Sequence, residues 1–234
     1  MGKSLLSIDW DYFICIKNKH YFGSYIENKR TIVDLWYKRY IQEKEQGKDI
    51  QDYFYLFPEV ECFWSKMKKI FQFDKDIKVY VSDSHAFSYK IAKENYCNKV
   101  YLFDAHADLG YGGISSLDFE VNCANWLGKL LKDKIIKEAN IIYSPFTKEK
   151  ISDFDAINQK FPINYFTIED MDQKIPLSFI HICRSGAWTP PWLDNKFRKF
   201  IQDLQLPYTK INCPYRKWDV EHINFSDKIQ YKLA

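Results

Sequence analysis

Four short apolar segments of this chain lack the alternation of polar and apolar residues that a half-exposed strand shows. They are Ser4–Ile8, Ile77–Val81, Lys99–Phe103 and Leu177–Cys183. Such runs are typical of parallel strands that helices cover on both faces. The segments Ile141–Tyr143 and Ile163–Phe166 are weaker strand candidates. The chain is therefore expected to build a sheet that is buried on both sides.

Segments with helical periodicity alternate with these strands. They are Thr31–Lys44, Glu59–Phe71, Ala86–Asn95, Asn122–Lys134 and Trp192–Leu204. Alternating strands and helices predict a mainly parallel sheet with right-handed crossovers. A chain of 234 residues suits one domain, so we expect a single three-layer α/β domain over residues 1–234.

The region between the first and second strands is too long for a simple crossover. It is rich in Tyr, Trp, Phe and basic residues, and we expect residues 16–75 to form a helical insertion over the carboxyl edge of the sheet. Two ordinary packing helices joined by a long loop are the alternative.

Charge and composition exclude several classes of function. Lys and Arg number 34 against 31 Asp and Glu, an excess too small to indicate a nucleic-acid partner or an anionic membrane. No apolar run is long enough for a transmembrane helix, and Asp9 interrupts the short apolar start, which therefore does not resemble a signal peptide. The six cysteines are scattered, so we expect reduced thiols in a cytoplasmic protein.

Acidic and histidine side chains follow three of the predicted strands. The groups are Asp9-Trp10-Asp11, Asp83-Ser84-His85 and Asp104-Ala105-His106-Ala107-Asp108. Open parallel sheets bind their ligands beyond the carboxyl ends of the strands. A lone Asp-x-Asp pair usually caps a turn, and Asp83 could cap a helix. The third group is more specific, since alternate residues of an extended chain point the same way and would repel one another without a cation.

These groups predict a metal centre with six direct ligands. We expect them to be Asp9, Asp11, His85, Asp104, His106 and Asp108, with Asp83 behind them. Six ligands exceed one tetrahedral zinc, and carboxylates mixed with imidazole suit two Mn²⁺-like ions that activate a water. Because two dications balance four aspartates, the pocket would favour a cationic guanidinium or amine over a phosphate ester.

The same motifs resemble those of the arginase (ureohydrolase) superfamily. The segment from Asp104 to Asp108 is similar to its Asp-Ala-His-x-Asp motif, and Ser7-Ile-Asp9-Trp-Asp11 to its Ser-x-Asp-x-Asp motif, although here the latter opens the chain. Ser82–His85 matches the Gly-Gly-Asp-His-Ser motif loosely. The early S-I-D-x-D-Y-F segment and the loop Ser185–Trp192 are most similar to peptide arginases, which convert arginine to ornithine in ribosomally made peptides.

The resemblance implies an arginase-like fold with a rearranged strand order and two Mn²⁺ ions. One ion would be held by His85, Asp104, Asp108 and Asp9, and the other by Asp104, His106, Asp9 and Asp11. Asp9, Asp104 and His106 would be catalytic. The family's proton-shuttling histidine, its guanidinium-binding glutamate and the residues that bind a free amino acid have no evident counterparts here, which favours an arginine within a peptide.

The function expected from this reading is hydrolysis of arginine side chains to ornithine and urea. A deacetylase of the same superfamily and a non-enzymatic, metal-stabilised binding module are the alternatives. The resemblance favours the first, because related deacetylases use one zinc and lack the second paired carboxylate.

Four further residues are candidate substrate contacts. They are Asp83, Asn125, Arg184 and Trp188. Arg184 could instead form a structural bridge with Asp83, Asn125 could serve helix packing, and Trp188 could belong to the core. His181, inside an apolar strand, is expected to be a hydrogen-bonded core histidine.

Overall fold

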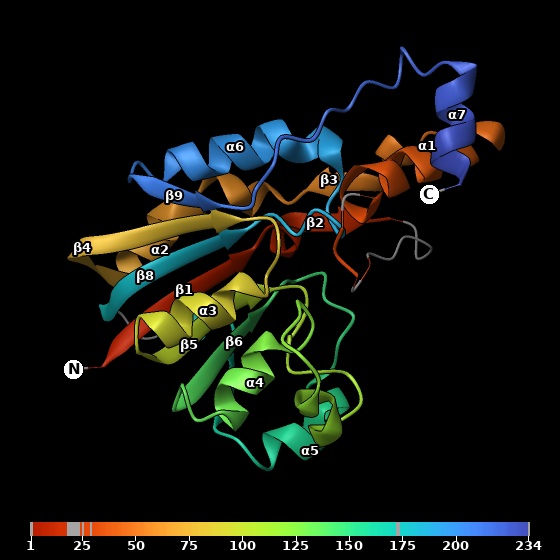
Figure 1. Cartoon of the computed structure of the whole chain (residues 1–234). Coiled ribbons are helices and arrows are strands. Elements are labelled where there is room, and N and C mark those ends of the chain that lie inside the picture. Colours follow the sequence, from red (N-terminus) through yellow and green to blue (C-terminus); the bar gives the residue numbers. More distant parts are fainter. Residues whose placement is uncertain (1, 18–23, 25, 29, 172–173, 234) are drawn as a thin grey trace.

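A computed structural model of the chain describes residues 2–17, 24, 26–28, 30–171 and 174–233. Its centre is a seven-stranded sheet with the order β7-β6-β5-β1-β8-β4-β9, in which every neighbouring pair is parallel (Figure 1). The strands are β1 (Lys3–Asp9), β4 (Phe71–Ser82), β5 (Cys97–Asp104), β6 (Glu138–Tyr143), β7 (Ile163–Phe166), β8 (Ile175–Cys183) and β9 (Tyr208–Ile211). The predicted three-layer, mainly parallel α/β fold is confirmed.

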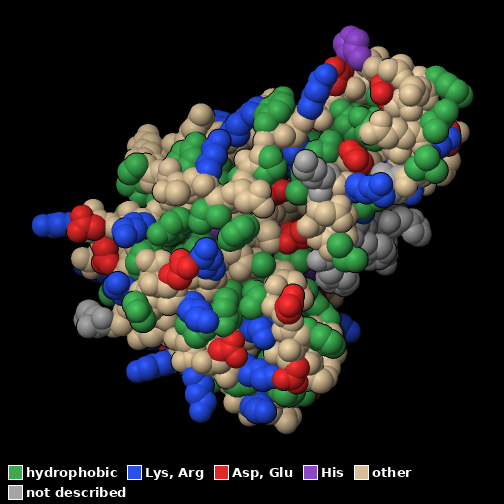
Figure 2. Space-filling model, in the orientation of Figure 1, with side chains coloured by type: hydrophobic (Ala, Val, Ile, Leu, Met, Phe, Trp, Pro, Cys, Tyr) green, Lys and Arg blue, Asp and Glu red, His purple; other side chains and the backbone are tan. Residues whose placement is uncertain are grey.

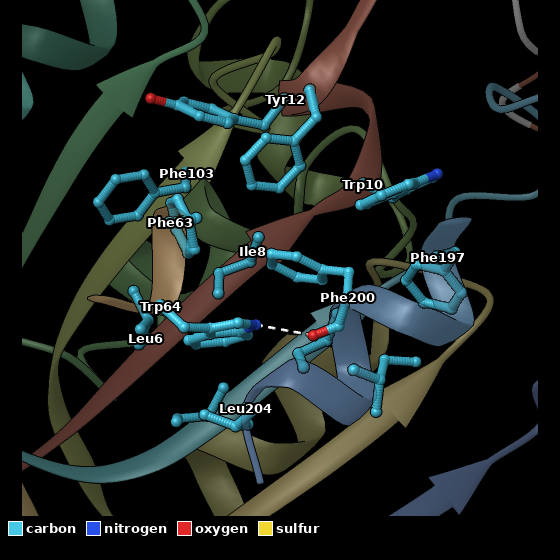
Figure 3. Packing of buried hydrophobic residues seen from close by; sticks show 14 of the residues in the cluster. Leu6, Ile8, Trp10, Tyr12, Phe63, Trp64, Phe103, Phe197, Phe200 and Leu204 are labelled. Carbon is cyan, nitrogen blue, oxygen red and sulfur yellow. Dashed lines mark hydrogen bonds between the residues drawn. The ribbon is translucent and has the colours of Figure 1, made fainter. Parts of the chain in front are cut away.

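Helices cover both faces of this sheet. On one face lie α2 (Phe63–Ile70) and α6 (Asp194–Asp203), and on the other lie α3 (Phe87–Glu94) and α4 (Trp126–Lys132). The short α5 (Asp155–Asn158) joins the second group. Figure 3 shows the first layer, where Trp64 of α2 donates a hydrogen bond from Nε1 to the carbonyl of Phe200 in α6 at 2.7 Å.

The central strand β1 explains why its sequence lacks alternation. Leu6 and Ile8 face α2 and α6, whereas Leu5 packs on the side of α3 and α4. Both sets are fully buried because a helix layer lies on each side. The residue between Leu6 and Ile8 on the α3 side is Ser7, a buried polar group in an otherwise apolar strand.

The described part of the predicted insertion, residues 16–75, contains both helices and strands, and residues 18–23, 25 and 29 of it lie outside the described residues. The antiparallel pair β2 (Ile14–Ile16) and β3 (Phe54–Leu56) flanks α1 (Leu35–Glu45), which contacts the C-terminal α7 (Phe225–Lys232). Trp36 of α1 donates a hydrogen bond from Nε1 to the carbonyl of Gly186, in the loop after β8, at 2.9 Å. This part therefore lies at the carboxyl edge, as expected, whereas α2 belongs to a helix layer of the sheet.

Strand β4 is longer than the apolar run that predicts it. It begins at Phe71, where Phe71–Phe73 pair with Ile175–Leu177 of β8, and the register then shifts before Lys78. The intervening charged residues hide this first part of the strand from a hydrophobicity pattern. Strands β2, β3 and β9 and helices α5 and α7 were not predicted.

Surface features agree with the modest net charge. On the face seen in Figure 2, acidic and basic side chains are intermixed. All six cysteines are free thiols. Among the described residues, no helix combines the length and the apolar character needed to cross a bilayer.

Candidate metal centre

The six predicted ligand residues meet at the carboxyl edge of the sheet. This ligand cluster consists of Asp9, Asp11, His85, Asp104, His106 and Asp108. Two ligands come from the end of β1 and the 3₁₀ turn after it, one from the loop after β4, and three from the end of β5 and its following loop. The parallel sheet thus brings together side chains from three separate segments.

His85 is surrounded by carboxylates on one side of its ring. Its Nδ1 lies 3.2 Å from Asp9 Oδ2, 3.0 Å from Asp104 Oδ2 and 2.9 Å from Asp108 Oδ2. One ring nitrogen carries at most one proton and cannot satisfy three acceptors. Within the described residues, neither His85 Nδ1 nor Asp104 Oδ2 has a hydrogen-bond partner of acceptable geometry, although both atoms are buried. A divalent cation would satisfy all of these groups together, so the donor set fits a metal.

Asp104 also belongs to a second group of possible ligands. The carboxylate of Asp11 lies 3.0 Å from His106 Nδ1, and Asp104 Oδ1 lies 3.5 Å from the same nitrogen. Ligand atoms of Asp11, Asp104 and His106 lie close enough for one ion, as do those of Asp9, His85 and Asp104. Asp104 is thus shared by both groups, and a bridging role for Asp104 or Asp9 between two ions stays a prediction.

The pKa values of the cluster reflect crowded charge. Burial raises the pKa of Asp104 well above its usual range, and the charges of Asp11 and Asp108 raise it further. Burial and the neighbouring Asp11 likewise raise the pKa of Asp9. Burial alone would lower the pKa of His85, but the close carboxylates of Asp104, Asp108 and Asp9 outweigh it and raise this pKa well above the ordinary value. Without a cation, burial and crowding therefore favour the protonated forms of Asp9, Asp104 and His85, and metal binding would compete with these protons.

Asp108 is held in place by the start of helix α4. Its carbonyl accepts hydrogen bonds from the backbone N–H groups of Leu127 (3.1 Å) and Gly128 (3.3 Å), and its Oδ2 accepts one from Trp126 Nε1 at 2.5 Å. The backbone of Asp108 is left-handed, with φ 51°. A Cβ on Gly128 would lie only 2.3 Å from the carbonyl oxygen of Leu109, so glycine allows this close packing.

Asp9 is oriented from two sides. Its Oδ1 accepts a hydrogen bond from the backbone N–H of Asp11 at 3.0 Å, and its Oδ2 accepts one from the Ser185 hydroxyl. Ser185 itself has φ 48°, a left-handed conformation that is uncommon for a residue with a side chain. The loop after β8 thus contributes a positioning contact to the ligand cluster.

A cavity of about 440 Å³ opens onto the ligand cluster. Tyr111, Phe146, Glu149 and Trp188 line its walls, and the rings of Trp188 and His106 lie 4.9 Å apart. The predicted position of Trp188 beside the site therefore agrees with the structure. Aromatic walls with acidic groups suit a long, cationic side chain.

Glu149 was not predicted as a site residue. It follows β6, and its Oε2 accepts a hydrogen bond from the backbone N–H of Ala107 at 2.7 Å, while Tyr111 donates to its Oε1. Burial raises its pKa. Because β6 is parallel to β5, the rule that ligands lie beyond the carboxyl ends of strands could have pointed to this loop.

Arg184 and Asp83 lie in a buried ion-pair network and do not line the cavity. Arg184 donates from Nε to Asp83 Oδ1 at 2.5 Å and from Nη1 to Asp194 Oδ2 at 3.0 Å, and Arg216 also pairs with Asp194. The geometry therefore favours the structural bridge over a substrate contact for both residues.

Asn125 also has a structural role. Its side chain accepts a hydrogen bond from the backbone N–H of Asn122 at 2.9 Å and donates to the carbonyl of Glu120 at 3.0 Å, which orders the turn before α4. It does not line the cavity at the ligand cluster. His181 is a buried, hydrogen-bonded core histidine, as predicted.

Comparisons of this chain with protein-family models, with curated proteins and with solved structures each gave no match. The function proposed below therefore rests on the motifs and on the geometry of the site.

Proposed function

We propose that this protein is a binuclear, Mn²⁺-dependent amidinohydrolase that converts arginine side chains to ornithine and urea. The observation that carries the proposal is the position of His85 Nδ1 within 3.2 Å of three carboxylate oxygens, beside a second group that shares Asp104. The resemblance of the motifs to arginases supplies the reaction class. When bound, the ions would supply a nucleophilic water at neutral pH.

Residues of this chain orient the metal ligands and favour a positively charged substrate. The Ser185 hydroxyl and the backbone N–H of Asp11 hold the Asp9 carboxylate, and Trp126 holds that of Asp108. Along the cavity, Glu149 adds a carboxyl group beyond those of the ligand cluster. Negative charge at this wall supports a guanidinium as the substrate group, because a cation is attracted to it and a phosphate ester is repelled.

We further propose that the arginine belongs to a peptide. Ile14 and Ile16 of β2 line the cavity beside the ligand cluster, and β2 pairs with β3, whose Tyr55 is exposed. Exposed aromatic and backbone groups of this kind can hold an extended peptide by stacking and hydrogen bonding. The partner expected is therefore an arginine-containing peptide or precursor peptide.

Urea release tests the reaction class directly. The protein would be stripped with a chelator, reloaded with Mn²⁺ and given arginine capped at both ends, free arginine and capped acetyl-lysine. We expect urea from capped arginine at least as fast as from free arginine, and no acetate. Asp118→Asn is the control, because Asp118 is exposed, and it should retain activity. Asp104→Ala should lose both activity and metal.

Other results would redirect the proposal. Acetate release without urea would support the deacetylase alternative. Mn²⁺ binding with no turnover of either substrate class would support the binding-module alternative. A strong preference for free arginine would refute the peptide part of the proposal and leave a small-molecule ureohydrolase.

A further inference from the structure

A chain of buried hydrogen bonds begins at the ring nitrogen of His85 that faces away from the carboxylates. His85 Nε2 lies 2.7 Å from Ser7 Oγ, and Ser7 Oγ lies 2.8 Å from Ser88 Oγ. Ser88 is the second residue of α3, and the helix places its hydroxyl over β1. All three side chains are buried.

The chain of hydrogen bonds continues through His181 and ends at a backbone carbonyl. Ser88 Oγ lies 2.5 Å from His181 Nδ1, and His181 Nε2 lies 2.7 Å from Ser82 Oγ. Ser82 Oγ then donates to the carbonyl oxygen of Ser84 at 2.8 Å. His181 is the residue of β8 opposite Ser7 of β1, so the pairing of the two strands places these two members of the hydrogen-bond chain side by side.

The final acceptor sets the direction of the hydrogens. A backbone carbonyl can only accept, so the single proton of Ser82 is directed to Ser84, and Ser82 Oγ accepts from His181 Nε2–H. A neutral imidazole that donates from one nitrogen accepts at the other. Burial lowers the pKa of His181 well below its ordinary value, which agrees with a neutral ring. His181 Nδ1 therefore accepts from the hydroxyl of Ser88.

The same donor-to-acceptor order extends back along the hydrogen bonds to His85 in the ligand cluster. Because Ser88 donates to His181, its oxygen accepts from Ser7, and the oxygen of Ser7 then accepts from His85 Nε2–H. With its proton on Nε2, a neutral His85 presents a lone pair at Nδ1, the atom that faces the carboxylates.

We propose that this serine–histidine relay, with His181 at its turning point, keeps the proton on Nε2 of His85 and leaves Nδ1 as the metal-ligating atom. His181 is thus a positioning residue that acts through two serines. The inference rests on the proposed metal centre, because a ligating nitrogen must be unprotonated. Removing a hydrogen-bond partner that fixes the tautomer of a ligating histidine typically weakens metal binding by roughly 10- to 100-fold.

Metal affinity in matched serine variants tests the relay. Ser88→Ala removes the hydroxyl between Ser7 and His181. Ser4→Ala is the control, because Ser4 lies on the same strand as Ser7 and its hydroxyl donates to the carbonyl of Pro176, away from the ligand cluster. Calorimetric titration with Mn²⁺ should show about 10-fold or greater weakening for Ser88→Ala and an affinity near that of the wild type for Ser4→Ala.

A spectroscopic measurement reports the tautomer itself. In protein labelled with ¹⁵N-histidine and loaded with diamagnetic Zn²⁺, we expect His85 to carry its proton on Nε2 in the wild type. Ser82→Ala removes the acceptor of His181 Nε2, and we expect a mixture of tautomers at His181. A change limited to packing would leave these nitrogen shifts unaltered.

The outcomes separate this inference from the function it rests on. If the wild-type protein bound no divalent ion, the metal centre would be refuted and the relay with it. If the wild type bound Mn²⁺ but Ser88→Ala and Ser4→Ala had equal affinities, the relay would be refuted while the metal centre remained. A proton on Nδ1 of His85 in the Zn²⁺-loaded protein would refute both the relay and His85 as a ligand. Should Ser88→Ala fail to fold, the nitrogen shifts of Ser82→Ala decide.

Discussion

Replacing Asp104 by asparagine should stabilise the metal-free protein while removing its response to metal. Asp104 is 1% exposed, and the charges of Asp11, Asp108 and Asp9 add to burial in raising the pKa of its carboxyl group. Asparagine keeps an oxygen that can accept the 2.8 Å hydrogen bond from the backbone N–H of His106. It removes a carboxyl group whose ionised form its acidic neighbours disfavour, and His85 still faces the carboxylates of Asp9 and Asp108.

The magnitude follows from the unpartnered oxygen of Asp104. A buried polar group without a hydrogen bond costs about 1–3 kcal/mol, so Asp104→Asn should raise the free energy of unfolding by roughly that amount in a chelator. For a protein of this size, this corresponds to a rise in Tm of roughly 2–12 °C. Conversely, Mn²⁺ at about 100 times its Kd should stabilise the wild type by about 2.7 kcal/mol and the variant far less.

Thermal unfolding with EDTA and with excess Mn²⁺ measures both effects. Asp194→Asn is the contrasting control, since Asp194 is paired with Arg184 and Arg216. Breaking that pairing should cost about 3–5 kcal/mol in both buffers and leave the Mn²⁺ response intact. A lower Tm for Asp104→Asn than for the wild type in EDTA would refute the reasoning about repulsion, and a retained Mn²⁺ response would refute the metal site.

Three further predictions address pH, packing and substrate. The raised pKa values of His85 and His106 mean that the folded, metal-free protein keeps protons that the unfolded chain releases, so its Tm in EDTA should fall from about pH 6 to pH 8; a rising Tm would contradict this. Gly128→Ala should cost about 1–3 kcal/mol and weaken Mn²⁺ binding in calorimetry, because the new Cβ would displace the loop that carries Asp108; unchanged affinity would exclude this coupling. Tyr55→Ala should raise the KM for capped arginine more than it lowers kcat in the urea assay, and a pure loss of kcat would argue against peptide binding at β3.

The ligand cluster was predictable because each of its residues lies at the end of a buried, locally recognisable strand or within four residues after it. The motif from Asp104 to Asp108 can be found without knowing the strand order, since any parallel arrangement places it at the carboxyl edge. The same reasoning missed Glu149, because the sequence of β6 gives only a weak strand pattern and the loop after β6 contains no histidine or paired acid. Ser185 was not predicted as a site residue, since nothing local indicates that its hydroxyl reaches Asp9.

Other features depend on contacts that a sequence pattern does not contain. Strand β9 is mostly exposed and lies at the edge of the sheet, where it pairs with β4. Its residues, Tyr208–Ile211, therefore need not be apolar, and a hydrophobicity pattern does not reveal the strand. Arg184 looked like a possible substrate contact because Asp194 and Arg216, its neighbours in the ion-pair network, lie 10 and more residues away in the sequence. Hydrophobic periodicity identifies elements, but it does not say which polar side chains meet.

The position of β8 in the sheet sets the time at which the site can assemble. β8 lies between β1 and β4, although it follows both of them in the chain by more than ninety residues. All six ligands are therefore synthesised before the strand that fixes the spacing between Asp9 and His85. Non-local pairings of this kind form late in folding, because a long loop must close first. A nascent chain halted before Ile175 would contain every ligand and still lack the strand that sets their spacing, so metal uptake would report that β8 has entered the sheet.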